Sequence, residues 1–376
     1  MFVVPLPTIF PRRGEEEVAG MTGKYAHNID AKGRLFIPAK LREELGGKNF
    51  HLIIGQDMCL SLFSDESWNE KMAALKEQSY SSLKKLRMIF AHAADCDPDA
   101  QGRILIADAD TGETLWEWRA ASAADMPDAT SLMRLPSEVK AIYNRRYILA
   151  TASGGGVALI RIADKKVLFY AKPGGNPHSA EVLPDKNIVV ASSTGNLLSV
   201  YVYNEDASYV SKPAFTMPVY SAHNVVWDRT RNCLWTATGA QLLKLSYNGN
   251  RTAPELSQVY SYDMGTGNTM AHDLAPVYGE EAMYVTTVEH VYKFDCKTAK
   301  FSDVQIFQQK DIKSLSTGPE GYSTIVMRPT SGGSNWWSAE VCDMKGNRLF
   351  NRAGYQIYKA RWYVENPFGY PEVHTL

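Results

Sequence analysis

The feature that most restricts the fold of this chain is a repeat of short β-type segments. Three histidines, His178, His223 and His272, follow one another at intervals of 45 and 49 residues, and each precedes two runs rich in Val, Leu, Tyr and Thr. An interval of this length matches one four-stranded blade, and regular short strands of this composition are typical of β-propellers. The sequence therefore predicts a propeller for the C-terminal part of the chain.

Less regular copies of the repeat begin near Ser137 and Ser314, and a partial copy begins at Gly102. The last β-type segment, residues 358–364, can complete this partial copy. Pairing the two ends in this way removes exposed strand edges. We therefore predict a mainly β chain with a six-bladed propeller over residues 107–376, closed by the C-terminal strand. This region is similar to uncharacterised bacterial six-bladed propeller proteins, a resemblance that implies no activity.

The residues before the propeller have a different composition. Residues 21–106 contain one Trp and two Tyr, whereas residues 107–376 contain seven Trp and eighteen Tyr. The net charge of −1 excludes attachment to nucleic acid or membrane by bulk charge, and no run of apolar residues is long enough to span a membrane. Five scattered cysteines favour neither a disulfide framework nor a thiolate zinc site, and they favour a reducing compartment. We expect two domains and a cytoplasmic protein.

Residues 1–20 do not resemble a signal peptide. The basic pair Arg12-Arg13 follows the apolar run instead of preceding it, and three Glu residues stand where a cleavage site needs small residues. Codons for Gly14 and these Glu residues would form a purine-rich run shortly before Met21, as in a bacterial ribosome-binding site. We predict that Met21 is the true start and that residues 1–20 are a non-native or disordered extension.

Residues 21–106 alternate short strands and helices. Two strands, over residues 25–29 and 34–37, flank a turn in which Gly33 supplies a positive φ, and Pro38 begins a helix that ends before Gly46. Ser64 can cap a second helix, and a helical spacing of apolar residues predicts a third over residues 81–93.

These segments resemble the MraZ family of bacterial transcriptional regulators. The resemblance is carried by Met21–Tyr25, His27–Leu35, Ile37–Leu45 and Cys96–Ile106. It implies two tandem SpoVT-AbrB half-modules, each with an Asp-x-x-x-Arg signature, which fold as a swapped-hairpin unit, assemble into rings and bind direct DNA repeats upstream of division and cell-wall genes. The two signatures here are Asp30–Arg34 and Asp99–Arg103.

The first signature is the candidate DNA contact. Asp30 and Arg34 can pair across the glycine turn, while cationic donors on the turn and the following helix can reach phosphates or guanine edges. The predicted DNA-binding residues are Asp30, Lys32, Gly33, Arg34, Lys40, Arg42 and, from the second signature, Arg103. The alternative is a salt-bridged turn without a DNA role.

The chain departs from the family after Ile106. A proline and a helix are expected there, but residues 107–112 read Ala-Asp-Ala-Asp-Thr-Gly. The predicted head over residues 21–106 therefore has a truncated second half-module, and its ring assembly and DNA affinity are in question.

The three repeated histidines are the candidate chemical site of the propeller. Because they share one position in their repeats, at the start of the innermost strand, they are expected to border the central channel. Three imidazoles around a divalent metal would suit Lewis-acid chemistry, with Asp273, Glu181 and either Lys359 or Arg361 as acid, base or carboxylate clamp. The alternative, which we weigh above the metal, is that each histidine caps a strand through backbone hydrogen bonds.

Two further motifs have weaker functional interpretations. The glycines over residues 154–156 lack a following lysine and helix, so they predict a hairpin turn and no phosphate loop. Trp336 and Trp337 can stack on sugar rings, although aromatic residues on propeller strands more often pack between sheets.

The sequence is compatible with three interpretations of the whole chain. In the first, an MraZ-like regulator head binds DNA in the nucleoid as a homo-oligomer, and the propeller binds a small molecule, a sugar or a protein. In the second, the propeller is a binding protein or a metal-dependent lyase or hydrolase, and the N-terminal segment is incidental. In the third, the reading frame joins two unrelated genes within residues 99–106, which sequencing across that junction would test.

Overall fold

A computed structural model describes residues 2–3, 26–27, 50–54, 60–69, 87–94, 102–265, 270–329, 336–364 and 368–369. The chain divides into one unit over Met1–Lys84 and a second over Lys85–Leu376. This division comes earlier than the predicted boundary between residues 106 and 107, which falls inside the strand β6 (Arg103–Asp108). No helix in the described ranges is long and apolar enough to cross a membrane.

The described part of the first unit consists of short β-pairs and one helical turn. The strand β1 (Phe2–Val3) pairs with β2 (Ala26–His27), and β3 (Phe50–Ile54) forms an antiparallel hairpin with β4 (Leu60–Ser64). Residues 65–69 are helical, and the Ser67 backbone N–H donates to Ser64 Oγ at 3.2 Å. The predicted cap at Ser64 is therefore confirmed. The predicted turn over residues 30–33 and the helix after Pro38 lie outside the described residues.

The second unit is a β-propeller. Five of its sheets are antiparallel blades of four consecutive strands each. These blades are β8 (Pro136–Ile142), β9 (Tyr147–Ala152), β10 (Gly156–Arg161) and β11 (Val167–Ala171); β12 (Pro177–Val182), β13 (Ile188–Ser192), β14 (Leu197–Tyr201) and β15 (Phe215–Pro218); β16 (Val226–Asp228), β17 (Cys233–Ala237), β18 (Gln241–Tyr247) and β19 (Leu256–Asp263); β20 (Ala271–Pro276), β21 (Ala282–Thr287), β22 (Val291–Asp295) and β23 (Lys300–Asp303); β24 (Ser314–Ser316), β25 (Ile325–Met327), β26 (Glu340–Asp343) and β27 (Arg348–Asn351).

The predicted count of six blades is therefore wrong for blades of consecutive strands, of which there are five, because one more four-stranded sheet is built from the two ends of the second unit. Its order is β28 (Tyr355–Trp362), β5 (Arg87–Ala94), β6 and β7 (Thr114–Arg119). The C-terminal strand thus completes the sheet that begins the unit, as predicted, but it pairs with β5 and not directly with β6. The predicted helix over residues 81–93 is wrong, because its second half forms β5, whose backbone pairs on both sides. Pairing with two neighbours overrides the helical spacing of the apolar residues.

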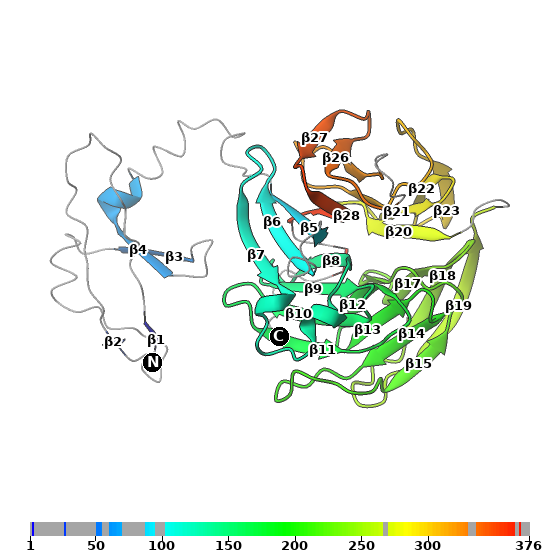
Figure 1. Cartoon of the computed structure of the whole chain (residues 1–376), viewed down its shortest axis with the longest axis horizontal. Coiled ribbons are helices and arrows are strands. Elements are labelled where there is room, and N and C mark those ends of the chain that lie inside the picture. The colour runs from blue at the N-terminus through cyan, green and yellow to red at the C-terminus, as the bar shows by residue number, and fades with distance from the viewer. Residues whose placement is uncertain are drawn as a thin grey trace. The chain divides into compact units, whose positions relative to one another are not determined.

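The innermost strands of these sheets form a closed cycle. Each of β8, β12, β16, β20, β24 and β28 contacts the next, and β28 contacts β8. Figure 1 shows β8, β12, β20 and β28 toward the middle of the second unit and β7, β15, β19, β23 and β27 toward its outside. Residues at the same position in each innermost strand therefore meet around one axis.

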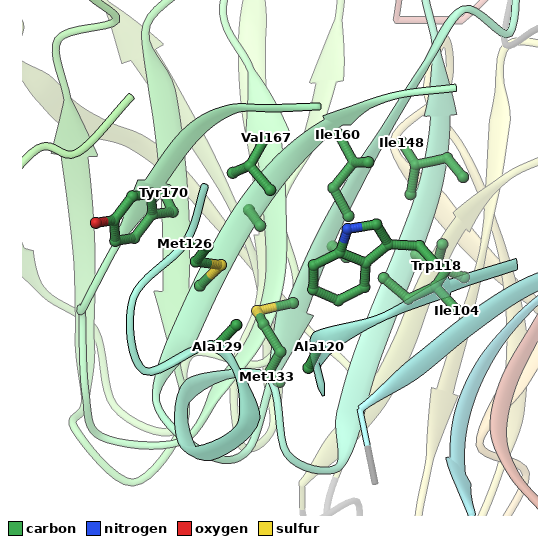
Figure 2. Close-up of a cluster of buried hydrophobic side chains, with 14 of the residues drawn as sticks. Ile104, Trp118, Ala120, Met126, Ala129, Met133, Ile148, Ile160, Val167 and Tyr170 are labelled. Atoms are coloured by element: carbon green, nitrogen blue, oxygen red, sulfur yellow. The ribbon is translucent and has the colours of Figure 1, made fainter. Parts of the chain in front are cut away.

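Apolar cores fill the spaces between neighbouring sheets. In one of them, Trp118 of β7 packs with Ile148 and Ile160 of the next blade, and all three are buried. Figure 2 shows Met126 and Met133, from the segment between β7 and β8, beside these side chains. That segment includes a 3-10 turn (Ala120–Ser122) and the short helix α4 (Ala129–Leu132). Helices of this length are not stable alone, so both depend on packing against the two sheets that the segment connects.

One local expectation is confirmed within the described residues. Gly154 and Gly155 lie in the turn between β9 and β10, as a hairpin interpretation requires. Cys233, Cys296 and Cys342 are free and buried, and burial raises the pKa of the Cys233 and Cys296 thiols to about 12. These two thiols are accordingly unreactive at neutral pH.

Candidate binding site at the channel mouth

One position of the repeat recurs in or just before each innermost strand. It is occupied by Ser137, His178, His223, His272, Lys313 and Tyr358. In four of the sheets the register of the innermost strand shifts across this position, for example between Pro177 and Ser179 and between Ile357 and Lys359. Such a β-bulge leaves one residue unpaired and redirects its side chain. The bulges therefore allow two successive residues of a strand to contribute to the axis.

Five of these six side chains line a cavity of about 380 Å³, called the mouth cavity below. Hydroxyl, amide and aromatic groups from the adjoining loops complete its wall. The described lining residues are Leu135, Pro136, Ser153, Asn176, His178, Ser193, Thr194, Ser221, His223, Met270, His272, Lys313, Trp336 and Tyr358.

The structure brings the three predicted histidines together. The ring centroids of His178 and His223 are 4.8 Å apart, and those of His223 and His272 are 6.2 Å apart. Tyr358 stands edge-on to His178 at 5.8 Å. The expected convergence of three blades on one end of the axis is thus present.

Backbone carbonyls define the tautomers of His178 and His223. His178 Nδ1 lies 3.0 Å from the Asn176 carbonyl oxygen, and His223 Nδ1 lies 2.9 Å from the Ser221 carbonyl oxygen. Because a carbonyl oxygen only accepts, each Nδ1 carries the proton. Burial lowers the pKa of His178 to about 3 and that of His223 to about 4, so both rings are neutral. Each Nε2 is therefore a hydrogen-bond acceptor.

His272 has a different partner, because Lys313 Nζ lies 2.8 Å from its Nε2. Burial, followed by the positive charge of Lys313, lowers the pKa of His272 to about 2, so the ammonium donates to a neutral imidazole. The remaining ring nitrogen, Nδ1, carries the proton and is buried without a hydrogen-bond partner in the described part of the chain.

This arrangement does not favour the predicted metal. Lys313 already occupies Nε2 of His272, and its positive charge would oppose a cation between the three rings. Among the residues that the structure describes, no group of three His, Cys, Asp or Glu side chains is disposed to hold a metal ion. The backbone hydrogen bonds of His178 and His223 agree with the alternative, in which these histidines have a structural role.

A buried ionic cluster follows the mouth cavity along the axis. Lys359 Nζ lies 3.0 Å from Glu138 Oε2 and 3.0 Å from Asp273 Oδ1, and Arg361 donates to the same two carboxylates at 2.5–3.1 Å. Asn224 Oδ1 accepts from Lys359 at 3.3 Å. We call Glu138, Asp273, Lys359 and Arg361 the axial cluster. It joins β28 to β8 and β20 across the axis.

The axial cluster is formally neutral and tightly paired. Burial raises the pKa of Glu138 and Asp273, but the positive charges of Arg361 and Lys359 outweigh burial and hold both pKa values below their ordinary range. The two carboxylates are therefore ionised at neutral pH and occupied by their cationic partners. Asp273, Lys359 and Arg361, predicted as acid, base or clamp, are engaged with one another and with Glu138.

Glu181, another predicted acid or base, lies elsewhere. Its Oε2 accepts from Lys140 Nζ at 3.1 Å, and burial raises the pKa of this carboxyl group. Both residues line a second cavity, of about 90 Å³, which also includes Arg361 but none of the three histidines. Glu181 therefore does not belong to the mouth cavity.

The neutral histidines predict a measurable acid sensitivity. The folded-state pKa values of about 3, 4 and 2 lie below the ordinary value of about 6.5. Unfolding near pH 5 consequently takes up a proton at each ring, so the stability present above pH 6.5 is lost as the pH falls. For His223→Gln, the slope of unfolding free energy against pH near pH 5 should fall by about 1.4 kcal/mol per pH unit.

Chemical denaturation of both proteins at pH 4.5 to 7 checks this expectation, and subtraction of the two slopes removes the contribution of every other histidine. Equal slopes for the wild type and His223→Gln would show that His223 is already protonated in the folded protein.

Most of the predicted DNA-binding residues lie outside the residues that the structure describes. Asp30, Lys32, Gly33, Arg34, Lys40 and Arg42 are outside the described residues. Arg103 is in β6 of the propeller, where its Nε donates to Glu117 and its guanidinium lies 5.7 Å from the centre of the Tyr355 ring. Arg103 therefore contributes to a sheet of the second unit, and its geometry gives no support to a DNA contact.

Lys313, Tyr358 and Glu138 were not predicted as site residues from the sequence. A signal was present for two of them: Lys313 adjoins the copy near Ser314 at the phase of the histidines, and Glu138 follows that phase by one residue, as Asp273 follows His272.

Together these features define a β-propeller protein with a cavity lined by histidine, lysine and aromatic side chains, and with a small separate unit before the propeller in the sequence. The family described as a family of unknown function, DUF6528, matches residues 72–376, and the chain belongs to this family. The family described as MraZ protein matches residues 21–87, so this part of the chain is an MraZ domain.

Relatives of the MraZ domain are bacterial regulators. The transcriptional regulator MraZ of Carboxydothermus hydrogenoformans is 46% identical over 87 residues, which cover 22% of this chain and 60% of that protein. The transcriptional regulator MraZ of Thermoanaerobacter sp. is 47% identical over 89 residues, which cover 23% of this chain and 62% of that protein. The chain thus spans less than two thirds of the length of these curated relatives.

A crystal structure of a protein of unknown function from Bacteroides caccae is similar to 74% of this chain and covers 99% of its own length. The sequence identity is 12% and the TM-score is 0.49, a similarity from which no function follows.

Proposed function

We propose that this chain is a DNA-binding transcriptional regulator whose propeller binds a small polar molecule in the mouth cavity. The DNA-binding part of the proposal is supported by the MraZ domain and its identity of about 45% to transcriptional regulators. The turn around Lys32 and Arg34 is the proposed contact, with Lys40 and Arg42 extending it. Cationic side chains at such a turn position a protein on phosphates and can read guanine.

Assembly of several chains would multiply this small contact. The net charge of −1 gives no general attraction to DNA, so affinity must come from the turn and from the number of heads that bind together. Direct DNA repeats are the corresponding target, and association with the nucleoid follows from it.

A gel-shift titration of the full chain on a probe with G-rich direct repeats tests the DNA-binding proposal. Replacing Lys32 and Arg34 by Ala should weaken binding strongly and reduce the slope of log affinity against log salt by about 2, since each lost phosphate contact contributes about 1. Lys212→Ala with Lys345→Ala removes the same charge from exposed positions of the propeller and serves as the control. Binding that survives in the head variant, or that is absent at low salt, refutes the proposal.

The ligand-binding part of the proposal rests on the mouth cavity. A volume of about 380 Å³ lies within the range of small-molecule sites, and several blades contribute polar groups to one wall. The lysine in its wall, Lys313, is the specific observation that favours a ligand, because it is only 5% exposed and its nearest carboxylate in the described chain is 3.8 Å away, and a buried charge without a close opposite charge is costly. Thermal stabilisation of the wild type by a metabolite, lost in His223→Phe, would support this function.

A further inference from the structure

Lys313 gives the mouth cavity an incompletely neutralised positive charge. Lys313 is the one Lys or Arg among the described residues that line the cavity, and it is only 5% exposed. Its single carboxylate neighbour in the described chain is Asp311, whose oxygen is 3.8 Å away and whose side chain is about half exposed. The other close partner, His272, is uncharged. An anion in the cavity would find a desolvated ammonium group there.

Two other residues that line the mouth cavity, His178 and His223, offer hydrogen-bond acceptors. Nε2 of His178 and Nε2 of His223 are unprotonated, because their Nδ1 atoms donate to backbone carbonyls. These acceptors disfavour any ionised oxygen beside them, whether of a carboxylate or of a phosphate, so an anionic group of the ligand is expected at Lys313 instead. They suit hydroxyl groups, which can donate to them.

One side of the cavity is aromatic and apolar. The Trp336 ring lies 6.3 Å from the Tyr358 ring at an angle of 59°, and Met270 adds a half-exposed thioether. Aromatic faces of this kind can cover the C–H groups of a polyhydroxylated carbon chain or ring.

We infer that the mouth cavity binds a small hydroxy-carboxylate, such as a sugar acid, whose carboxylate contacts Lys313 and whose hydroxyl groups donate to His178 and His223. Lys313 disfavours a cationic ligand, and its single positive charge matches a carboxylate better than a phosphate group, which carries up to two negative charges. This inference rests on the proposed ligand-binding role of the propeller and is independent of DNA binding.

The charge state of Lys313 adds a pH dependence to the inference. Burial lowers the pKa of Lys313 to about 8, against the smaller opposing effect of Asp311. The other titratable groups near it are the neutral His178, His223 and His272 and the cationic Lys359, which is paired in the axial cluster. A carboxylate favours the protonated form of Lys313, so affinity should be constant below pH 7 and decline above pH 8.

Isothermal titration calorimetry of the full chain tests the inference with D-glucuronate, D-gluconate and L-tartrate as probes, all at up to millimolar concentrations. D-glucose and D-glucose 6-phosphate are the neutral and phosphorylated comparisons. At least one carboxylate probe should bind with 1:1 stoichiometry and at least about tenfold tighter than D-glucose, the difference expected for one charge-assisted hydrogen bond. Lys313→Gln should remove this difference, whereas Lys310→Gln, at an exposed lysine three residues earlier, should leave it unchanged.

The remaining outcomes distinguish failure of the carboxylate assignment from failure of ligand binding by the propeller. Equal binding of D-glucuronate and D-glucose, abolished by His223→Phe, would overturn the carboxylate assignment and leave the propeller as a ligand-binding domain. Stronger binding of D-glucose 6-phosphate would overturn it in favour of phosphate. No saturable binding of any carboxylate probe, or full retention of binding in Lys313→Gln, would also overturn it. If no carboxylate probe bound but another ligand stabilised the protein against heat, the proposed ligand-binding function would still be supported.

Discussion

Replacing Lys359 by Met should lower the free energy of unfolding of the propeller by about 3–5 kcal/mol, the usual effect of removing one partner from a buried ion pair. Lys359 is completely buried, and its Nζ lies 3.0 Å from both Glu138 and Asp273. In the variant, two buried carboxylates share the single charge of Arg361. Urea denaturation followed by tryptophan fluorescence measures the change, since seven of the eight Trp residues lie in residues 107–376.

The control and a compensating variant make the Lys359 prediction specific. Lys345→Met removes an exposed lysine from the turn after β26 and should change stability by less than about 0.5 kcal/mol. Lys359→Met combined with Asp273→Asn restores charge balance, so the double variant should be more stable than the sum of the two single effects predicts. Strict additivity, or a loss below about 1 kcal/mol for Lys359→Met alone, would mean that the axial cluster is hydrated and weakly coupled.

The propeller class could be predicted from the sequence because each blade repeats one local pattern. The interval from His178 to His223 contains a complete set of short strands and turns, and sheets of this kind must stack to bury their faces. The composite sheet was harder to predict. Its β5 strand has the apolar spacing of a helix, and only pairing with β28, more than 250 residues away, and with β6 makes it a strand.

The site was predictable in position but not in chemistry. The shared repeat phase of His178, His223 and His272 placed them together, and the structure confirms this. The protonation states depend on atoms that no spacing reveals, namely the carbonyl oxygens of Asn176 and Ser221. The pairing of Lys313 with His272, which argues against a metal, joins residues from different blades. Side-chain partners across the axis are set by the closure of the propeller.

Replacing Trp235 by Ala should destabilise the propeller by about 3–5 kcal/mol, the range for truncation of a large buried aromatic residue. Trp235 of β17 is 1% exposed, and its ring lies 5.3 Å from Phe294 and 5.9 Å from Tyr262. It therefore fills the space between two neighbouring blades. Its Nε1 also donates to the buried Asp228 at 3.1 Å. The variant creates a cavity and removes one donor from a buried carboxylate.

A second substitution separates the two contributions of Trp235. Trp235→Phe keeps most of the apolar volume but loses the donor to Asp228, which retains Arg231 at 3.2 Å, so the expected loss is about 1–2 kcal/mol. Tyr260→Ala, at a residue that is 60% exposed on β19, is the matched control and should change stability little. Thermal and urea unfolding followed by circular dichroism avoid the loss of a fluorophore. If Trp235→Ala lowered the free energy of unfolding no more than Tyr260→Ala, the packing of the two blades would not depend on Trp235. The axial cluster would then have to stabilise the association of the blades.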